Sequence, residues 1–402
     1  MEIAIIGAGP GGLTCARVLQ KAGMPVTVYD ADTALTARDQ GGTLDIHADT
    51  GQIALADAGL TAEFAALARP EGQSKRMLDP SGAVVMEHLV DDDEDTAPEI
   101  DRAQLRGLLA ASLAPGTIRW GHRVTEVRPG GEVVLADRPP ITADLVIGAD
   151  GAWSRVRPLL TPATPEYTGI SFVEVRFTEV DERHPAIAEL VGQGHMWANG
   201  DGQNLILQRN SGGHVRGYVG IRAELDWLAR AGLGRADGRG GVVDANGVQA
   251  LDTERVRAEL LERFAHFAAP LRRVITDSEG DLVNRPIFAL PAPLAWPHRP
   301  GLTLLGDAAH LMSPFGGEGV NLAMLDGAEL AREIAAGGAP DEAVTRYETR
   351  MLARSGPVAA GANGAIKEFF EGGFDLADVP DFAEETEQWK ANAAAYLAGR
   401  EN

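Results

Sequence analysis

A glycine-rich turn near the start of the chain constrains the fold more than any other feature of the sequence. Residues 3–6 form a short apolar run typical of a buried strand, the motif Gly7–Gly12 (GAGPGG) follows it, and residues 13–21 have the pattern of a helix. In such a turn the first glycine permits a tight bend, the second lets a pyrophosphate approach the backbone, and the third lets helix and strand pack closely. Residues 26–29 predict a second strand, and Asp30 at its end is placed to accept hydrogen bonds from a ribose. The pattern therefore predicts a βαβ unit that binds a dinucleotide.

A second glycine-rich loop follows an apolar run at residues 302–305. It begins at Gly306 and Asp307, contains Pro314, and leads at Gly319 into an expected helix. Such a loop presents free backbone N–H groups and the positive end of a helix dipole, which suit a group that carries negative charge during its chemistry. Together the two loops predict one extended redox cofactor held at both ends. FAD fits this arrangement better than a nicotinamide that exchanges freely.

Another motif lies between these two loops, so it is the second of three in chain order and the loop at Gly306 is the third. An apolar strand expected at residues 144–148 leads into Asp150 and Gly151, and Ser154 and Arg157 follow at positions where they can fix the next stretch of backbone. Taken alone, this segment is also compatible with an ordinary turn in which an aspartate caps the following helix.

The sequence between and after the motifs predicts two further kinds of structure. Antiparallel strands are expected at residues 170–177, 193–198, 204–209 and 214–221, and alanine-rich helices at residues 319–336, 341–370 and 382–398. We therefore expect an α/β fold. A discontinuous Rossmann-type FAD-binding domain would take residues 1–72, 98–165 and 282–340, an inserted mixed β-sheet substrate-binding domain residues 73–97 and 166–281, and a C-terminal helical segment, residues 341–402, would bridge them.

The composition excludes some classes of binding partner and indicates the cellular compartment. The chain has 402 residues and a formal net charge of −22, and it has no basic stripe, so neither nucleic acid nor an anionic membrane is expected as a partner. Cys15 is the single cysteine, which excludes an intrachain disulfide and favours a reducing compartment, the cytoplasm. No apolar run approaches the ~18 residues that span a bilayer. We expect a monomer without a metal site.

The three motifs, in this order, resemble those of the group A flavin-dependent aromatic hydroxylases, the family of para-hydroxybenzoate hydroxylase. Residues 150–157 and 306–321 carry this resemblance. More closely, the chain resembles the tetracycline-inactivating flavin monooxygenases, through residues 41–47, residues 100–106 and the segment from Asp307 to Asn321. Glu318 departs from that pattern, because glutamine is usual at this position and an added negative charge would oppose an anionic flavin unless the side chain turns away or stays protonated.

The resemblance implies a role for each matching residue. The glycines of the first motif would hold the pyrophosphate, Asp30 the adenosine ribose, Arg102 the ribityl–phosphate region, and Asp307 the ribityl hydroxyls and the pyrophosphate. Residues 319–321 would face the pyrimidine edge of the flavin, and Arg38 and Asp45 are candidates to position the isoalloxazine. The full set of expected cofactor-binding residues is Gly7, Gly9, Pro10, Gly11, Gly12, Asp30, Arg38, Asp45, Arg102, Asp307, Pro314, Gly317, Gly319, Val320 and Asn321.

The same resemblance implies the reaction. We expect hydroxylation of an aromatic or polyketide-like small molecule, a class that includes tetracycline-like compounds, with NADPH or NADH and dioxygen, through a flavin 4a-hydroperoxide. The cofactor then carries the chemistry and no catalytic side chain is assigned. Two alternatives remain open: a flavin-dependent reductase or oxidase, and a flavoprotein that binds and sequesters a drug without converting it. A simple NAD-dependent dehydrogenase is opposed by the motif around Asp307.

The strands after residue 168 provide candidates for substrate contact. Alternation along residues 170–177 places Val173 and Val175 on one face of the sheet and Phe172 and Glu174 on the other. The polar face is either solvated or the floor of a pocket that faces the flavin. If it is a pocket floor, the candidate substrate residues are Glu174, His195, Arg216 and Tyr218.

Overall fold

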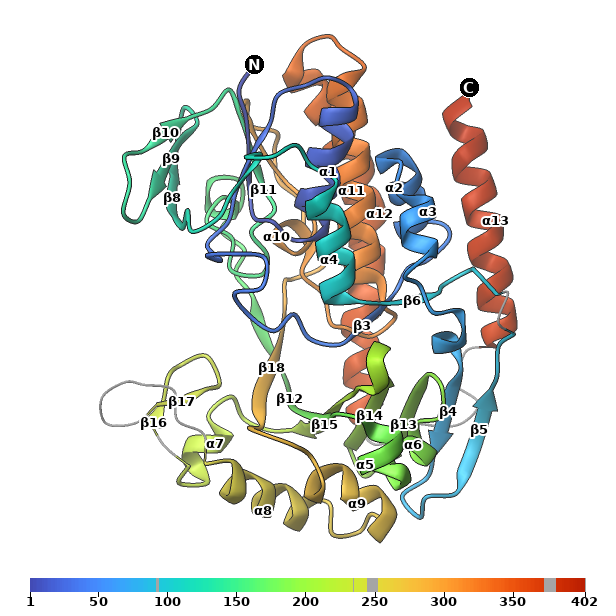
Figure 1. Ribbon diagram of the computed structural model, residues 1–402. Helices are drawn as coiled ribbons and strands as arrows, with labels where there is room; N and C mark the ends of the chain where they lie inside the picture. The colour runs from blue at the N-terminus through green and yellow to red at the C-terminus, as the bar shows by residue number, and fades with distance from the viewer. Residues whose placement is uncertain (92–93, 234, 244–251, 372–380, 402) are drawn as a thin grey trace.

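The computed structural model describes residues 1–91, 94–233, 235–243, 252–371 and 381–401 (Figure 1). Residues 92–93, 234, 244–251, 372–380 and 402, which belong to the expected substrate-binding domain and C-terminal segment, lie outside the described residues. A Rossmann-type half with its helices stands above a broad β-sheet that is backed by short helices (Figure 1). The α/β fold class expected from the sequence is confirmed.

A five-stranded parallel sheet forms the centre of the upper half. Its order is β19-β11-β1-β2-β7, so strands from the start, middle and end of the chain lie next to one another. Strands β1, β11 and β19 are buried along their whole length, as apolar strands of parallel sheets generally are. The strands are β1 (Ile3–Ile6), β2 (Thr27–Tyr29), β7 (Ile118–Arg119), β11 (Leu145–Gly148) and β19 (Leu302–Leu304).

The register of this sheet brings the three sequence motifs together. Ile6 lies opposite Gly148, and Gly148 lies opposite Leu304, so β1, β11 and β19 end at the same edge. The glycine turn, the turn at Asp150 and the loop at Gly306 all leave from this edge, where open α/β sheets bind their ligands. Helix α1 (Pro10–Lys21) and helix α10 (Asp307–His310) begin there.

Smaller elements complete the upper half. Two short helices follow β3 and are divided at Gly59, which adopts a left-handed conformation with φ 70° and ends the first of them. Strand β3 forms because Thr43–Asp45 pairs with Glu99–Asp101. These elements are α2 (Gly51–Ala58), α3 (Thr61–Ala65), the 3-10 turn Pro70–Gln73, β3 (Thr43–Asp45), β6 (Glu99–Asp101), α4 (Arg102–Ala111), β8 (Val124–Arg128), β9 (Glu132–Leu135), β10 (Ile141–Thr142) and the 3-10 turn Arg157–Leu159.

The lower half is a seven-stranded mixed sheet with the order β18-β12-β15-β14-β13-β4-β5. Strand β18 belongs to this sheet, whereas the boundary expected at residue 282 assigned it to the FAD-binding domain. It pairs with β12 at the edge of the sheet, where Pro286 is tolerated. The strands are β4 (Lys75–Leu78), β5 (Val84–His88), β12 (Glu166–Phe177), β13 (His195–Gly200), β14 (Gln203–Arg209), β15 (Val215–Arg222) and β18 (Val283–Ala289).

The two faces of this sheet have different partners. Val173, Val175 and Phe177 pack into an apolar core beneath the sheet, and Phe172 and Glu174 face the upper half, as the alternation predicted. The core is covered by several short helices that follow β12 and β15 in the chain. The lower elements are α5 (Val180–Arg183), α6 (Pro185–Val191), the 3-10 turn Ser211–Gly213, α7 (Trp227–Arg230), β16 (Arg235–Ala236), β17 (Val242–Val243), α8 (Thr253–Arg263) and α9 (Ala269–Thr276).

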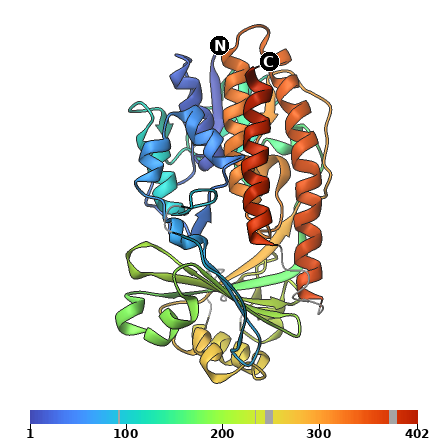
Figure 2. The same ribbon diagram turned by 90° about the vertical axis from the view of Figure 1, so that its right-hand side faces the viewer.

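Three long helices follow β19 in the chain, and the second of them connects the two halves. Helix α11 (Glu318–Ala335) packs along α1, and helix α12 (Pro340–Phe370) reaches from the upper half down to the seven-stranded sheet, where Phe370 joins a small core with Phe172 (Figure 2). Helix α13 (Phe382–Glu401) runs along the outside of the upper half. Among the described residues, no helix is both long and apolar enough to cross a membrane.

Glycines make the contact between α1 and α11 unusually close. A Cβ atom built on Gly327 would lie 2.3 Å from the carbonyl oxygen of Gly11, and one built on Gly11 would lie 2.5 Å from the carbonyl oxygen of Ala323. The carbonyl groups of Gly11 and Ala323 cannot move out of the way unless the whole helix moves. Side chains at these two positions would therefore force apart the helices that carry the first and third motifs.

We predict that Gly327→Ala lowers the free energy of unfolding by about 1–3 kcal/mol, the usual cost of overpacking a core. Urea denaturation of the purified protein measures this change. Gly364→Ala in α12 is the matched control, because a Cβ there meets no atom within 4 Å. The control should raise stability by about 0.5–1 kcal/mol through helix propensity, and equal effects at both sites would contradict the prediction.

Candidate active site

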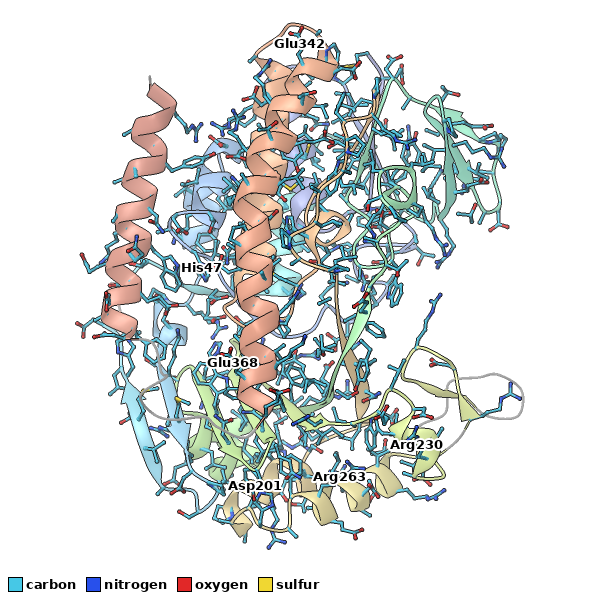
Figure 3. All side chains as sticks on the ribbon, turned by 180° about the vertical axis from the view of Figure 1, so that it is seen from behind. His47, Asp201, Arg230, Arg263, Glu342 and Glu368 are labelled. Carbon is cyan, nitrogen blue, oxygen red and sulfur yellow. The ribbon has the colours of Figure 1, made fainter. Side chains whose placement is uncertain are left out.

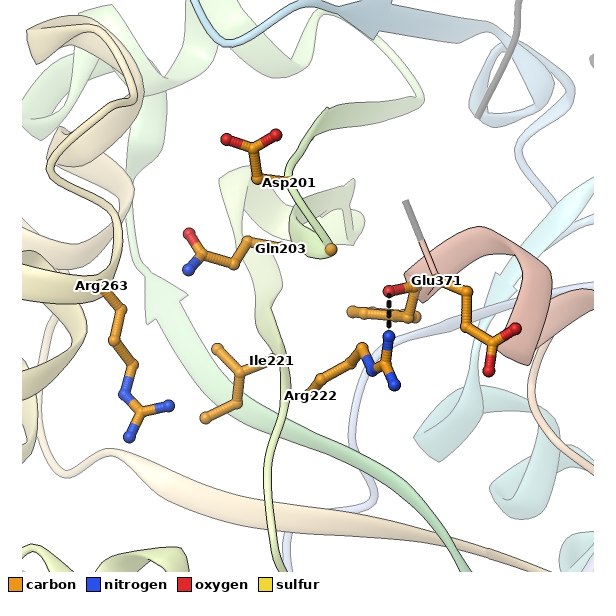
Figure 4. A pocket seen from close by; sticks show the side chains of 8 residues that line it. Asp201, Gln203, Ile221, Arg222, Arg263 and Glu371 are labelled. Atoms are coloured by element: carbon orange, nitrogen blue, oxygen red, sulfur yellow. Dashed lines mark hydrogen bonds between the residues drawn. The ribbon is translucent and has the colours of Figure 1, made fainter. Parts of the chain in front are cut away.

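One continuous cavity of ≈1780 Å³ extends from the glycine turn after β1 to the upper face of the seven-stranded sheet. Pockets for a single small ligand generally measure roughly 300–1,000 Å³. The cavity therefore has room for an extended cofactor and a second molecule. A smaller hollow of ≈180 Å³ lies beside Asp201, Arg222 and Arg263, and it is too small for a dinucleotide (Figure 4).

The glycines of the first motif divide into two kinds. A Cβ on Gly7, whose φ is +110°, would lie 2.2 Å from the carbonyl oxygen of Ala149, and one on Gly12 would lie 2.3 Å from the carbonyl oxygen of Gly7. These two glycines serve the packing of the chain. A Cβ on Gly9 would meet no protein atom within 4 Å, and Gly9 lines the cavity. The open space at Gly9 fits a pyrophosphate that approaches the backbone.

Asp30 and Arg106 hold the turn in shape. The backbone N–H of Ala8 donates to Asp30 Oδ2 at 2.6 Å, and Arg106 Nε donates to the carbonyl oxygen of Ala8 at 2.9 Å. Arg106 is 2% exposed, and its Nη2 lies 3.0 Å from Asp32 Oδ2. Asp30 and Gly7 therefore support the site from outside the cavity lining. No role was expected for Arg106 from the sequence, although its place beside buried Leu105 puts a charge within the apolar face of a helix.

At the carboxyl end of β19, Asp307 opens onto the cavity. Its carboxylate has no hydrogen-bond partner among the described side chains, which leaves it free to accept from the hydroxyls of a ligand. Burial within the surrounding protein raises its pKa, and His310, Arg102 and Arg157 act in the opposite direction. Arg102 also lines the cavity.

Arg157 joins the second and third motifs. This buried guanidinium donates to the carbonyl oxygen of Ala308 at 3.2 Å and to that of Ala152 at 2.6 Å. His310 is likewise structural in its contacts, because its Nε2 lies 2.6 Å from Asp326 Oδ2, which also accepts from the backbone N–H of Gly306. Both side chains steady the loop at Gly306 from behind.

The loop before α11 presents backbone to the cavity. Pro314, Gly317, Gly319 and Val320 line it, and the helix has no side-chain cap at its N-terminus, so its first N–H groups are available to a ligand. Asn321 is fully buried and turned away from the cavity. Its Nδ2 donates to the carbonyl oxygens of Asp45 and Gly317 at 2.9 and 3.1 Å, and its Oδ1 accepts from the backbone N–H of His47.

The remaining expected cofactor residues lie near the same wall. Asp45 lines the cavity and pairs with His47, whose Nε2 lies 3.1 Å from Asp45 Oδ2. Arg38 lines the cavity at its outer rim, where it is largely exposed and donates to Asp32. Pro10, Gly11 and Gly12 line the pyrophosphate end.

The expected substrate residues fall on the floor of the cavity, with one exception. Glu174 lines it, and its two oxygens accept from Arg216 at 2.6 Å and from Arg285 at 3.0 Å. Arg216 also binds Asp39 and stays behind the lining. His195 lines the cavity with Nε2 2.7 Å from buried Glu99. The two arginines balance the negative charge of Glu174 and hold its carboxylate in place.

Tyr218 differs from these residues because its hydroxyl has no hydrogen-bond partner among the described residues. Burial raises the pKa of Tyr218, so the phenol stays protonated and can both donate and accept. Within the described part of the chain, no group of three or more His, Cys, Asp or Glu side chains is arranged to hold a metal ion.

Comparisons with known proteins agree with this geometry. Residues 1–219 and 294–362 match the model of a family described as FAD binding domain. A monooxygenase, penA, from Penicillium thymicola is 32% identical over 83% of this chain and 84% of its own length. Among solved structures, Klebsiella pneumoniae HpxO complexed with FAD and uric acid has a TM-score of 0.73 at 20% identity, covering 98% of this chain and 93% of that one. The tetracycline destructase Tet(51) has a TM-score of 0.65 at 18% identity, covering 98% and 97%.

Fold, cavity and relatives together define the class, which is that of the FAD-dependent monooxygenases, oxidoreductases that use NAD(P)H as reductant. The chain belongs to the FAD-binding domain family. The resemblance found in the sequence is thereby confirmed at the level of the family.

We predict that Gly9→Ala raises the dissociation constant of FAD at least about tenfold, equivalent to roughly 1.4 kcal/mol, and leaves the apoprotein's melting temperature unchanged. The reason is that a methyl group at Gly9 occupies only the space of the ligand. Fluorescence titration of apoprotein with FAD measures the affinity.

Gly12→Ala is the contrasting variant, because its methyl group would collide with the carbonyl oxygen of Gly7. It should lower the melting temperature of the apoprotein itself. If Gly9→Ala bound FAD with unchanged affinity, the pyrophosphate would not lie at this turn.

Proposed function

We propose that the chain hydroxylates a flat, electron-rich aromatic or polyketide-like molecule on the floor of the cavity, with dioxygen as the second substrate. The observation that carries this proposal is the continuity of the cavity from the glycine turn to a floor of aromatic and apolar side chains. Phe172, Trp197, Ile206, Tyr218 and Phe369 line that floor. Such a surface suits a planar ring system, and a few polar groups suffice to orient it.

We propose that FAD lies along the upper wall of this cavity. Gly9 and the start of α1 would receive the pyrophosphate, Asp307 the ribityl hydroxyls, Arg102 the adjoining phosphate region, and the N-terminus of α11 the pyrimidine edge of the ring. Bound FAD supplies the acceptance of hydride from NAD(P)H and the activation of dioxygen for transfer of one oxygen atom. The uncapped N–H groups of α11 would stabilise negative charge that develops at that edge.

The chain's own residues would orient the substrate and exclude water. Glu174 is held between two arginines and so presents a fixed, neutralised surface rather than a free base. Tyr218 offers an unpaired hydroxyl to a phenol or carbonyl of the substrate. Trp389 and Phe382 of α13 line the same cavity and would shield it from solvent on that side.

The proposal also covers the domain boundaries, the cellular compartment and the oligomeric state of the protein. We propose an FAD-binding domain of residues 1–72, 98–165 and 290–340, with β18 placed in the substrate-binding domain because it pairs there. The C-terminal helices would bridge the two. We also propose a monomer in the cytoplasm, where the buried, unpaired thiol of Cys15 would remain reduced.

NADPH oxidation by the FAD-loaded protein across a panel of phenols, phenolic polyketides and tetracyclines tests the reaction, with product mass read in parallel. We expect stimulated NADPH use and a product heavier by one oxygen atom for at least one polycyclic phenol. Stimulated oxidation without an oxygenated product would instead support a reductase or oxidase. Tight substrate binding without NADPH use would support sequestration.

We predict that Tyr218→Phe raises KM for the stimulating substrate about two- to tenfold, since it removes one hydrogen bond worth about 0.5–1.5 kcal/mol. NADPH oxidation without substrate should not change. Tyr167→Phe is the matched control, because the hydroxyl of Tyr167 is already bonded to Ser171 and to the carbonyl oxygen of Ala223 within the sheet. An equal effect of both substitutions on KM would contradict the placement of substrate at Tyr218.

A further inference from the structure

We propose that Glu318 takes up a proton from water when the cofactor is reduced, so that the charge of the cavity wall adjusts to the redox state of the bound ring. This inference rests on the proposed placement of FAD against the N-terminus of α11. The feature that carries it is a crowded set of acidic side chains around one buried histidine on that wall.

Glu318 is the first residue of α11 and lines the cavity. Its Oε2 lies 3.8 Å from Nδ1 of His47, which is fully buried and makes no hydrogen bond at that nitrogen. The other nitrogen of His47 lies 3.1 Å from Asp45 Oδ2. The histidine thus stands between two carboxylates and binds only one of them closely.

Two neighbouring side chains hold the histidine in position. The side-chain amide of Asn321 donates to the backbone carbonyl of Asp45 and accepts from the backbone N–H of His47. Trp389 of α13 stacks on the imidazole with the ring centroids 4.3 Å apart. In Figure 3, His47 is seen in the region between α13 and α12. The stacking on Trp389 and the contact with Asp45 therefore hold the imidazole in its present orientation.

The charges around Glu318 are mostly of its own sign. Asp45 on β3, Asp49 in the turn before α2, and Glu385 on α13 all face it, and His47 is the one facing cation among the described neighbours. Lys75 of β4 and His195 of β13 act on Asp45 rather than on Glu318. If Glu318 were ionised, its only facing cation among the described neighbours would be His47, which already pairs with Asp45.

This environment shifts the pKa values of Glu318 and Asp45 in opposite directions. Burial, reinforced by Asp49 and Asp45 and opposed by His47, raises the pKa of Glu318 to about 7. Burial acts to lower the pKa of His47, but attraction to Asp45, Glu318 and Asp49 together outweighs it and the net shift is upward. Burial acts to raise the pKa of Asp45, but His47, Lys75 and His195 together outweigh it and the net shift is downward. Asp45 and His47 thus remain an ion pair while Glu318 exchanges its proton near neutrality.

Reduction adds negative charge to the same wall. Hydride transfer delivers two electrons and one proton, which leaves the reduced ring with one negative charge more than the oxidised ring. That charge favours the protonated form of Glu318 further. At a pH above 7, where Glu318 is ionised beside the oxidised ring, up to one proton then moves from water to the Glu318 carboxylate for each ring reduced. Glutamine, which is usual at this position in the family that the sequence resembles, cannot take up this proton.

The midpoint potential of bound FAD, measured against pH from 6 to 9 by equilibration with redox dyes, tests the inference without substrate or turnover. In the unaltered protein the slope should steepen above pH 7 by about 30 mV per pH unit, the value for one further proton per two electrons. Glu318→Gln should lack the steepening, and the two proteins should nearly coincide at pH 6. Glu318→Asp, which keeps a titrating carboxyl, should restore the steepening.

Glu368→Gln is the matched control, because it removes another carboxylate that lines the cavity, on α12, and leaves the acid–histidine cluster intact. Its slope should follow that of the unaltered protein. A Glu318→Gln potential displaced by a constant amount at every pH would overturn the inference and leave Glu318 a structural residue. Failure of the unaltered protein to retain FAD would refute the proposed function itself, which the slopes alone do not test.

Discussion

The parallel pairing of β1, β11 and β19 is the constraint on which the rest of the structure depends. These strands come from residues 3–6, 145–148 and 302–304, and they end at one edge of the sheet. Each turn that leaves this edge brings backbone groups rather than catalytic side chains. The close glycine contact between α1 and α11 then fixes the distance between the first and third motifs. A cofactor that spans both motifs is held by main-chain geometry set in the core.

Side chains near this edge act mainly on the protein. Asp30 and Arg106 bind the two sides of the Ala8 peptide, Arg157 binds carbonyls of two motifs, and Asn321 links α11 to β3. Such contacts immobilise the groups that face the cavity, which is how a site reaches its geometry before a ligand arrives. Asp307 is an exception, since no described side chain binds its carboxylate, and on the floor opposite the hydroxyl of Tyr218 has no partner among the described residues either.

The elements with local signals were predictable. The glycine pattern after β1, the turn at Gly306 and the alternation along β12 each follow from neighbouring residues, and each is found as expected. Strand β3 and strand β18 were not predictable, because each exists only through a partner far away in sequence. The same limit applies to Asp30 and Asn321. Their positions in the sequence indicated that they lie near a ligand. Only the packing shows that their side chains bind the chain's own backbone and do not line the cavity.

The order of the sheet has a consequence for how the chain is made. Residue 302 emerges long after β1 and β11, so the edge of β11 that β19 will cover stays open while about 150 further residues are synthesised. During that interval the seven-stranded sheet has β4, β5, β12, β13, β14, β15 and β18 available in the growing chain and can close before the Rossmann sheet does. Contacts of such long sequence separation form slowly and leave strand edges exposed in the meantime. The sheet edge at which the three motifs meet is therefore completed only after the seven-stranded sheet can close, and the helices α12 and α13 are added later still.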